Sequence, residues 1–168
     1  MESIQKRNCV LDKEDISRKM KRMALQVAEQ NHEETELIIA GITGNGEIVA
    51  QELLQNLEKI SSFSTRFVRV QLNKKELLDV TLDPHTDLTN KVIILVDDVA
   101  NTGKTMLYAL KPFLAVHPKK VQTMVLVERS HKLFPIQTDY AGLSIATTLQ
   151  EHIVVETDKE TITGAWLY

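Results

Sequence analysis

Apolar residues at two different spacings divide the chain into predicted helices and strands. Apolar side chains at helical spacing predict an amphipathic helix over roughly residues 13–30: Ile16, Met20, Met23, Ala24 and Val27. Asp12 stands directly before this helix and suits its N-cap, and Asp15 follows as an imperfect capping box. The mixed charges on the other face of the helix fit a solvated surface.

Short apolar runs predict the strands of a sheet. They lie at residues 36–41, 63–72, 92–96, 121–127, 152–156 and 164–168. Between them, apolar residues from Ile48 to Leu57 predict a second helix, and Met106–Val116 predicts a third, which Pro112 must kink or end. Because strands and helices alternate through the middle of the chain, we expect an α/β fold with a central, mostly parallel sheet flanked by helices.

Residues 73–90 are polar and contain Pro84, so they predict a short helix, or a hairpin with a loop, at the surface. The segment directly precedes the apolar run at 92–96. It is therefore placed to act as a flap over a site there, although it also fits a plain connection. We expect a single domain over residues 1–168, with residues 72–90 as a flexible flap or hood segment.

Composition narrows the function classes. The chain has 168 residues, of which 43% are hydrophobic and 26% charged, as in ordinary soluble globular proteins. A net charge of −3 gives no basic field that would draw nucleic acid or a membrane. The single Cys9 excludes an internal disulfide framework and a cysteine metal site. The N-terminus is too polar for a signal peptide, and no apolar run reaches membrane-spanning length, so we expect a cytoplasmic enzyme or regulator with no membrane partner.

The segment from Val92 to Thr105 carries the candidate chemistry. Its first five residues, Val92–Val96, predict a buried strand that two carboxylates, Asp97 and Asp98, close. Thr102–Thr105, with the sequence Thr-Gly-Lys-Thr, then opens a helix, where main-chain N–H groups, hydroxyls and a lysine suit a phosphate. Carboxylates at the end of a strand suit ribose hydroxyls and Mg²⁺. An ordinary strand–helix turn is the alternative, and a Walker A loop is excluded because Asp98 stands where its first glycine would be.

A second glycine-rich turn follows the apolar run at 36–41. Residues 41–46 contain three glycines in six positions, which lets a backbone approach an anion closely. Alone, this spacing fits a tight strand–helix turn equally well. In a parallel α/β sheet, ligands bind beyond the carboxyl ends of the strands, where residues 41–46, 97–105 and 128–131 would all lie.

These motifs resemble a known pattern. An apolar strand, two acids and Thr-Gly-Lys-Thr105 resemble the 5-phosphoribosyl diphosphate (PRPP) signature of type I phosphoribosyltransferases. Nearly the whole chain is similar to the pyrimidine-operon regulator/uracil phosphoribosyltransferase family (PyrR), since Leu11-Asp12, Val96–Thr105, Leu126–Pro135 and Asp139–Gly142 follow in family order. The resemblance implies a type I phosphoribosyltransferase fold with a small hood, dependence on Mg²⁺, and a homodimer or larger homo-oligomer.

The resemblance also implies roles for individual residues. Asp97 and Asp98 would be the catalytic acids that bind the ribose hydroxyls and the metal. The residues implied to bind the 5-phosphate are Ala100, Asn101, Thr102, Gly103, Lys104 and Thr105. Those implied to face pyrophosphate are Ile42, Thr43, Gly44, Asn45 and Gly46. Glu128, Tyr140 and Ala141 would border the base, with Tyr140 stacking on it, although a buried core tyrosine fits the sequence as well.

The chain departs from the family pattern at two loops. The family carries Lys-Thr-Arg-Gly where this chain has Thr43–Gly46, and Tyr-Arg-Asp-Asp where it has Leu72–Lys75. Each lost cation weakens the stabilisation of a leaving pyrophosphate. The amides of Gly44 and Gly46, Mg²⁺, and Lys74 or Lys75 are candidates to compensate.

Substrate and partner are indicated by single positions. Members that act on 6-oxopurines have Asp where Asn101 stands and Lys where Glu128 stands, so both positions favour a pyrimidine. Family residues that bind RNA are only partly present: Arg22, His131 and Lys132 match, but Leu25 and Gln30 stand where His and Arg are expected. Together with the acidic net charge, this weighs against specific RNA binding.

The sequence therefore predicts a PRPP-dependent phosphoribosyltransferase, with uracil as the favoured base and UMP and pyrophosphate as products. The alternative is a regulator of PyrR type that binds PRPP or a nucleotide with weak catalysis and acts on RNA or a protein partner. A P-loop-like nucleotide hydrolase is a third, weaker interpretation, because the first Walker glycine is absent.

Overall fold

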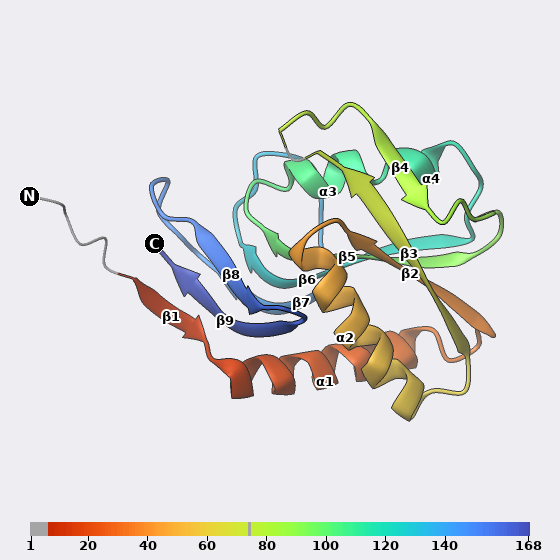
Figure 1. Ribbon diagram of the computed structural model, residues 1–168, viewed down its shortest axis with the longest axis horizontal. Coiled ribbons are helices and arrows are strands. Elements are labelled where there is room, and N and C mark those ends of the chain that lie inside the picture. The colour runs from red at the N-terminus through yellow and green to blue at the C-terminus, as the bar shows by residue number, and fades with distance from the viewer. Residues whose placement is uncertain (1–6, 74) are drawn as a thin grey trace, which may run out of the picture.

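A six-stranded sheet runs through the centre of the protein, of which the computed structural model describes residues 7–73 and 75–168 (Figure 1). In spatial order the strands are β4 (Val80–Asp83), β3 (Ser64–Leu72), β2 (Glu36–Ile42), β5 (Val92–Ala100), β6 (Lys120–Arg129) and β7 (Tyr140–Ile145). Strand β4 pairs antiparallel with β3, and every other neighbouring pair is parallel. The predicted mostly parallel sheet is confirmed.

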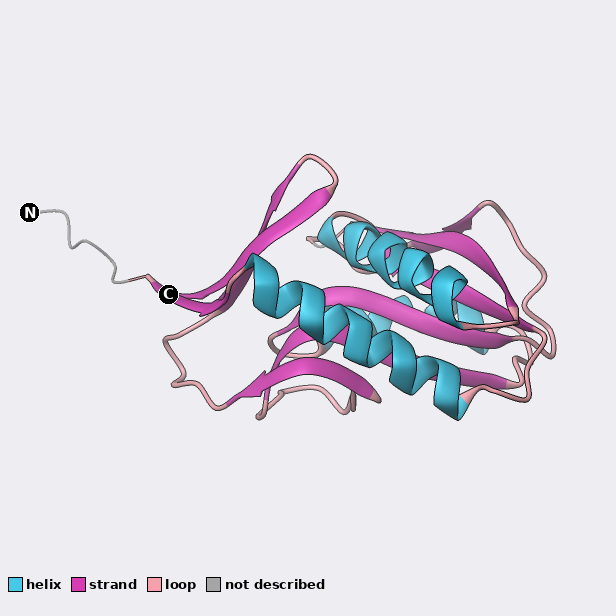
Figure 2. Cartoon of the chain, turned by 90° about the horizontal axis from the view of Figure 1, so that it is seen from below, coloured by secondary structure: helices cyan, strands magenta, loops and turns pink. Residues whose placement is uncertain are grey.

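Helices cover both faces of this sheet. Helices α1 (Lys13–Gln30) and α2 (Asn45–Ile60) lie across one face, as Figure 2 shows, and the short α3 (Lys104–Ala109) and α4 (Lys111–Leu114) lie on the other. The predicted start of α1 is confirmed, because Asp12 and Asp15 form a reciprocal capping box.

The two helical layers explain why the inner strands are apolar at every position. In β2, Ile39 packs with the core under α1 and α2, while its neighbour Ile38 packs with the core under α3 and α4. In β5, Ile94 and Ile93 divide in the same way. A strand that is covered on both faces therefore reads as a continuous apolar run.

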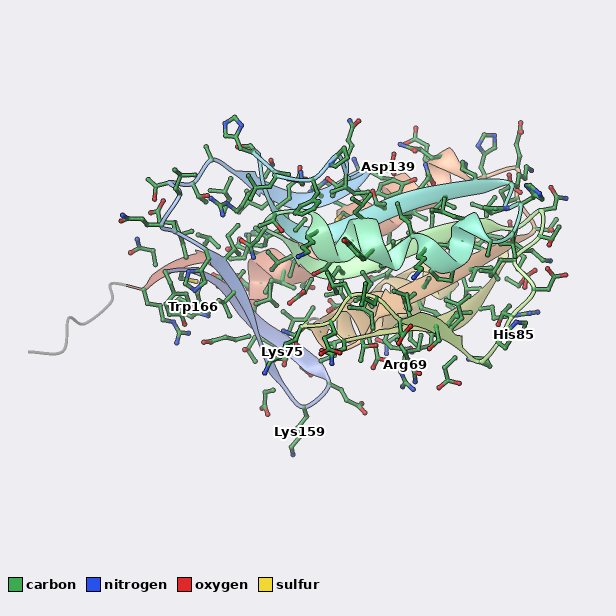
Figure 3. All side chains as sticks on the ribbon, turned by 90° about the horizontal axis from the view of Figure 1, so that it is seen from above. Arg69, Lys75, His85, Asp139, Lys159 and Trp166 are labelled. Carbon is green, nitrogen blue, oxygen red and sulfur yellow. The ribbon has the colours of Figure 1, made fainter. Side chains whose placement is uncertain are left out.

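The chain ends build a second, smaller sheet. Strands β1 (Asn8–Leu11), β9 (Thr161–Leu167) and β8 (Ile153–Asp158) pair antiparallel in the order β1-β9-β8. Figure 3 shows Lys159 at the tip of the β8–β9 hairpin, with Trp166 towards its other end. We call this three-stranded sheet the hood. The strands predicted near residues 152–156 and 164–168 are confirmed.

Residues 72–90 lie outside this three-stranded sheet, and their role as a flexible flap over the site stays a prediction. The predicted hairpin is present, because β3 and β4 pair antiparallel. Leu88 is buried in the core, and Lys111 Nζ donates a hydrogen bond of 2.6 Å to the carbonyl of Leu78, which ties the segment to α4. Lys74 lies outside the described residues. The hood comes from residues that only the folded chain brings together.

One element boundary differs from the sequence prediction, and one predicted break is confirmed. Strand β5 does not close at the acids but continues to Ala100, because β6 pairs alongside it as far as Glu128. The predicted helix over Met106–Val116 is split into α3 and α4 at Leu110. Pro112 accounts for the break, since it has no N–H to continue the helical hydrogen bonds.

Candidate active site

The two glycine-containing loops leave the sheet side by side. Strand β2 continues through α2 to β3 on one side, and β5 continues through α3 and α4 to β6 on the other. Since β2 and β5 are neighbours, the order of the sheet reverses between them. Open α/β sheets bind ligands at such a switch point, beyond the carboxyl ends of the strands.

A cavity of about 290 Å³ opens at this point. It is lined by Asn45, by the stretch Asp97–Met106, and by Ile153, Val154 and Val155 of the hood. Both predicted acids and all six residues predicted to bind the 5-phosphate thus lie around one cavity. The hood strand β8 forms its other wall.

Asp97 and Asp98 are held in fixed positions near the end of β5. Their exposed fractions are 2% and 8%. The Oδ1 atom of Asp97 accepts a hydrogen bond of 2.9 Å from the amide of Asp98, and Oδ1 of Asp98 accepts one of 2.8 Å from the amide of Val99. Oδ2 of Asp98 accepts a further bond of 3.1 Å from Asn45 Nδ2. These contacts leave the carboxylates as preorganised oxygen acceptors at the cavity wall.

The acid pair fits a Mg²⁺ ion that is shared with a substrate. Among the described residues, no group of three or more His, Cys, Asp or Glu side chains could hold a metal. Mg²⁺ is usually bound through one or two carboxylates, with substrate phosphates and water completing its coordination. Two adjacent carboxylates in a cavity wall match that requirement. A metal site made of protein groups alone would need more ligands than the described residues gather here.

The loop from Ala100 to Thr105 is braced from outside. Gly103 has φ +83°, and a Cβ atom there would lie 2.4 Å from Ile136 Cγ2. The amides of Leu133 and Phe134 donate hydrogen bonds of 3.0 and 3.1 Å to the carbonyl of Thr102. A glycine is therefore required at the turn both for its backbone angle and for the close packing of the 132–136 segment.

The Thr102 hydroxyl also accepts a hydrogen bond of 3.2 Å from the amide of Lys104, and the Lys104 side chain is exposed. The turn thus presents hydroxyl groups and an exposed cation beside the acids, with Lys104 Nζ lying 5.9 Å from the centre of the Phe134 ring. That set of groups suits a phosphate.

The predicted pyrophosphate loop, residues 42–46, is mainly structural in its contacts. The amide and the hydroxyl of Thr43 both donate to the carbonyl of Val70, at 3.0 and 2.7 Å. Gly44 adopts φ +96° as the N-cap of α2. Asn45 alone among these five residues lines the cavity. Ile42 is buried in β2, and Gly46 packs against Asp97.

Glu128 lies beside the cavity but does not line it. It is the parallel-strand partner of Ala100 at the end of β6. Its carboxylate accepts hydrogen bonds from Lys132 Nζ at 2.6 Å and from Thr138 Oγ1 at 2.5 Å. The side chains of Glu128 and Lys132 are only 14% and 12% exposed. The pair borders a neighbouring cavity of about 650 Å³.

The prediction that Tyr140 stacks on a base was wrong, and its alternative, a buried core tyrosine, describes the structure. Tyr140 is 1% exposed, and its hydroxyl has two acceptors for its one proton, Oε1 of Gln30 at 3.0 Å and Oε1 of Gln122 at 2.9 Å. Burial raises the pKa of the Tyr140 phenol to about 12. The ring faces α1 because Tyr140 opens β7 on that side of the sheet.

Two basic residues that match the RNA-binding pattern are engaged within the chain. Arg22 Nη2 donates to the carbonyls of Ala141 and Gly142, at 3.0 and 2.8 Å, and so joins α1 to β7. Lys132 is paired with Glu128. The carbonyl of Ala141 is therefore a structural acceptor, while its side chain packs against the core under α3 and α4.

Sequence reasoning missed the hood residues of the cavity. Ile153, Val154 and Val155 belong to a predicted strand, but nothing in their spacing points to a site. Asn101 donates through Nδ2 to the carbonyl of Ile153 and accepts through Oδ1 from its amide, both at 3.2 Å. Only the folded chain reveals that contact, which joins residues 52 positions apart.

A known protein family matches most of this chain, including all residues that line the cavity. The family model described as a phosphoribosyl transferase domain matches residues 7–161. The chain belongs to this family. A relative named "Bifunctional protein PyrR" from Macrococcus caseolyticus is 32% identical over 159 residues, which cover 89% of this chain and 91% of the relative. A "Pyrimidine operon regulatory protein" from Lactococcus lactis is 31% identical over 152 residues, which cover 88% of each chain.

Solved structures of phosphoribosyltransferases share the fold. The hypoxanthine phosphoribosyltransferase of Trypanosoma cruzi superposes with a TM-score of 0.77 over 94% of this chain and 95% of that chain, at 15% identity. A hypoxanthine-guanine phosphoribosyltransferase from Bacillus anthracis gives a TM-score of 0.73 at 17% identity, over 94% of this chain and 96% of that chain. The type I phosphoribosyltransferase fold is thus confirmed. Within the described part of the chain, no helix combines the length and apolar character needed to cross a membrane.

Proposed function

We propose that the protein transfers the phosphoribosyl group of PRPP to a nucleobase and releases pyrophosphate, with uracil as the favoured base and UMP as the product. One observation carries the proposal: Asp97, Asp98 and the Thr102–Thr105 turn line one cavity at the switch point of the sheet, under the hood. Acids for a diol and a turn for a phosphate are the two groups that a phosphoribosyl unit requires.

Each wall of the cavity has a role in this proposal. Asp97 and Asp98 accept hydrogen bonds from the ribose hydroxyls. Residues 100–105 hold the 5-phosphate through main-chain amides, the threonine hydroxyls and Lys104. Residues 42–46 face the pyrophosphate, and Glu128 and Ala141 border the base beside Ala100. Tyr140 has no part in the site.

The chemistry requires positioning and charge stabilisation. The bond from ribose C1 to pyrophosphate breaks, a bond from C1 to the base nitrogen forms, and positive charge builds on the ribose between these events. Buried carboxylates close to the ribose favour that charge. When bound by Asp97 and Asp98, Mg²⁺ supplies neutralisation of the pyrophosphate charge. The hood strand β8 excludes water from the cationic ribose, and the fixed walls hold the two reactants in line.

Two contacts support a pyrimidine over a 6-oxopurine. Position 101 is an asparagine, so it has no carboxylate to present to a purine, and both of its polar side-chain atoms are hydrogen-bonded to Ile153. Glu128 forms an ion pair with Lys132, so the end of β6 presents a carboxylate paired with an ammonium group and not an unpaired lysine. The relatives named as PyrR and as a pyrimidine operon regulatory protein support the same class of base.

The experiment that tests this function is product formation from PRPP and Mg²⁺ with uracil, hypoxanthine, guanine, xanthine, adenine and orotate in separate reactions. We expect UMP from uracil and little product from the other bases. A purine nucleotide as main product would keep the reaction and refute the choice of base. No product with any base would refute the transferase.

A second candidate function is a regulator that binds PRPP or a nucleotide without appreciable turnover. The loop at residues 42–46 favours it, because that loop carries no basic side chain to stabilise a leaving pyrophosphate. Such a regulator would raise its melting temperature with PRPP or UMP while forming no product. The sequence supplies the rest of the transferase proposal: a cytoplasmic homodimer or larger homo-oligomer, in which the partial basic pattern weighs against specific RNA binding.

A further inference from the structure

The hood presents an open strand edge to the cavity. In the order β1-β9-β8, strand β8 pairs with β9 on one side, and no other strand of residues 7–73 and 75–168 pairs with its second side. His152 exchanges two main-chain hydrogen bonds with Tyr168, of 3.2 and 3.1 Å, so alternate residues of the strand face β9. The main-chain groups of Ile153 and Val155 therefore face the other way, towards the cavity that these residues line. An open edge of this kind offers unpaired amides and carbonyls to any partner.

Asn101 pairs with this edge as a further strand would. Its Oδ1 accepts from the amide of Ile153 and its Nδ2 donates to the carbonyl of Ile153, each at 3.2 Å. A side-chain amide matches a main-chain amide in having one donor and one acceptor group side by side. A carboxylate of the same size could accept from the Ile153 amide but would repel its carbonyl.

Asn45 forms hydrogen bonds with the same strand edge two residues further along, at Val155. Its Nδ2 donates to the carbonyl of Val155 at 3.0 Å and to Oδ2 of Asp98 at 3.1 Å. Its Oδ1 accepts from the hydroxyl of Thr157 at 3.3 Å. One side chain thus joins the 42–46 loop, an acid of the cavity and the hood.

We propose that Asn45 and Asn101 are positioning residues that clamp strand β8 over the cavity, one from each of the two loops at the switch point. Asn45 has a second task, because its hydrogen bond also fixes the direction in which the Asp98 carboxylate points. The clamp explains why the polar atoms of Asn101 are turned to the hood and not to a ligand. Its effect on turnover rests on the proposed function, whereas its hold on β8 does not.

The test compares Asn101→Asp and Asn45→Asp with a matched control, Asn56→Asp. Each change keeps the size of the side chain and replaces the amide donor by a carboxylate. Asn56 donates only to the carbonyl of Glu52 one turn earlier in α2, at 2.8 Å, and lies outside the cavity. Asn101→Ala and Asn45→Ala serve if a carboxylate variant fails to fold. The thermal melt of each variant shows whether it folds.

The first readout is amide hydrogen exchange of the peptide covering residues 151–158. We expect exchange there to be about tenfold faster in both clamp variants and unchanged in Asn56→Asp, because local opening sets exchange rates. Unchanged exchange at 151–158 in folded variants of both asparagines would overturn the clamp. This readout does not need the protein to be a transferase.

The second readout separates positioning from a merely structural role. In the transferase assay, Asn45→Asp should lower kcat by about 10- to 100-fold, the usual cost of removing an outer partner of a site carboxylate. Asn101→Asp should act mainly on the KM of the base, since it loosens the hood and leaves Asp98 in place. Equal kinetics of both variants and the control would overturn the positioning role. An inactive wild type with fast-exchanging variants would refute the proposed function and leave the clamp standing.

Discussion

Gly46 lies so close to Asp97 that a Cβ atom at position 46 would be 2.9 Å from Asp97 Oδ1 and 3.1 Å from the carbonyl oxygen of Val96. This contact brings the first turn of α2 against the end of β5, where the acids stand. A side chain at position 46 would have to move either the helix or the carboxylate. The position of one acid in the cavity thus depends on the absence of a side chain in the neighbouring loop.

Gly46→Ala tests this packing. The added methyl should cost about 1–3 kcal/mol of unfolding free energy, as overpacking does in tightly packed sites, and should lower turnover by displacing Asp97. Chemical denaturation and the transferase assay measure the two effects. Gln55→Ala, at an exposed position of the same helix, is the control and should change neither. Full stability and activity in Gly46→Ala would show that the loop yields to the methyl without moving the acid.

The parts of the site that could be predicted from sequence are those carried by one continuous segment. Asp97 and Asp98 lie near the end of strand β5 and the turn to Thr105 follows it directly, so their proximity is set by the chain itself. The neighbouring loop at 42–46 could be added because parallel strands place their carboxyl ends at one edge of the sheet.

What could not be predicted depends on contacts between distant residues. Nothing in the pattern around Ile153 indicates that Asn101 will pair with it, because no periodicity links two segments that only the tertiary fold brings together. The role of Tyr140 could not be predicted for a related reason. An aromatic residue at the start of a strand suits either a ligand contact or a place in the core. The hydrogen bonds to Gln30 and Gln122, which lie on two other elements, place it in the core.

Tyr140→Phe tests the corrected role of this residue. Gln30 Oε1 still accepts from Gln122 Nε2, and Gln122 Oε1 from Asn31 Nδ2, after the hydroxyl is removed. We therefore expect a loss of only about 0.5–1.5 kcal/mol, typical of one hydrogen bond. The KM of the base should not change. A large rise in that KM without loss of stability would mean that Tyr140 contacts the base after all.

The raised pKa of Tyr140 adds a pH dependence to this comparison. The phenol has a folded-state pKa of about 12, above its ordinary value of 10.0, so the folded protein retains the proton longer than the unfolded chain. The contribution of Tyr140 is complete below pH 10 and is lost as the pH rises from there towards 12. Denaturation of wild type and Tyr140→Phe across this range should show the difference in stability shrinking. A difference that stays constant would contradict the burial of the phenol.

Glu128→Gln tests the pair at the end of β6. Lys132 would keep its charge with little solvent around it, so we expect a loss of about 3 kcal/mol, the lower end for a broken buried pair. If Glu128 borders the base as proposed, the KM of uracil should also rise about tenfold, while the KM of PRPP stays unchanged. Lys132→Met is the companion variant, because it removes the other partner of the same ion pair. A loss of stability with an unchanged KM of uracil would make the pair purely structural.

Glu52 provides a test of burial away from the cavity. Burial raises the pKa of the Glu52 carboxyl above its ordinary value of 4.5, because α2 places the group in a groove against α1. The unfolded chain therefore gives up this proton at lower pH than the folded protein does, and stability is lost as the pH rises through the folded pKa. Glu52→Gln should raise the melting temperature at pH 7 and make no difference near pH 4. An equal change at both pH values would contradict this cause.

The most direct test of the account is turnover of PRPP, uracil and Mg²⁺ by the wild type and by Asp98→Asn, with the thermal melt of each protein measured alongside. We expect UMP from the wild type, and a fall in kcat of at least about 100-fold in Asp98→Asn, as when a charge-stabilising group of a site is removed. The melting temperature of the variant should stay close to that of the wild type, because Asp98 lies at the cavity wall and not in the apolar core. Full activity of Asp98→Asn would contradict the assignment of this cavity as the active site.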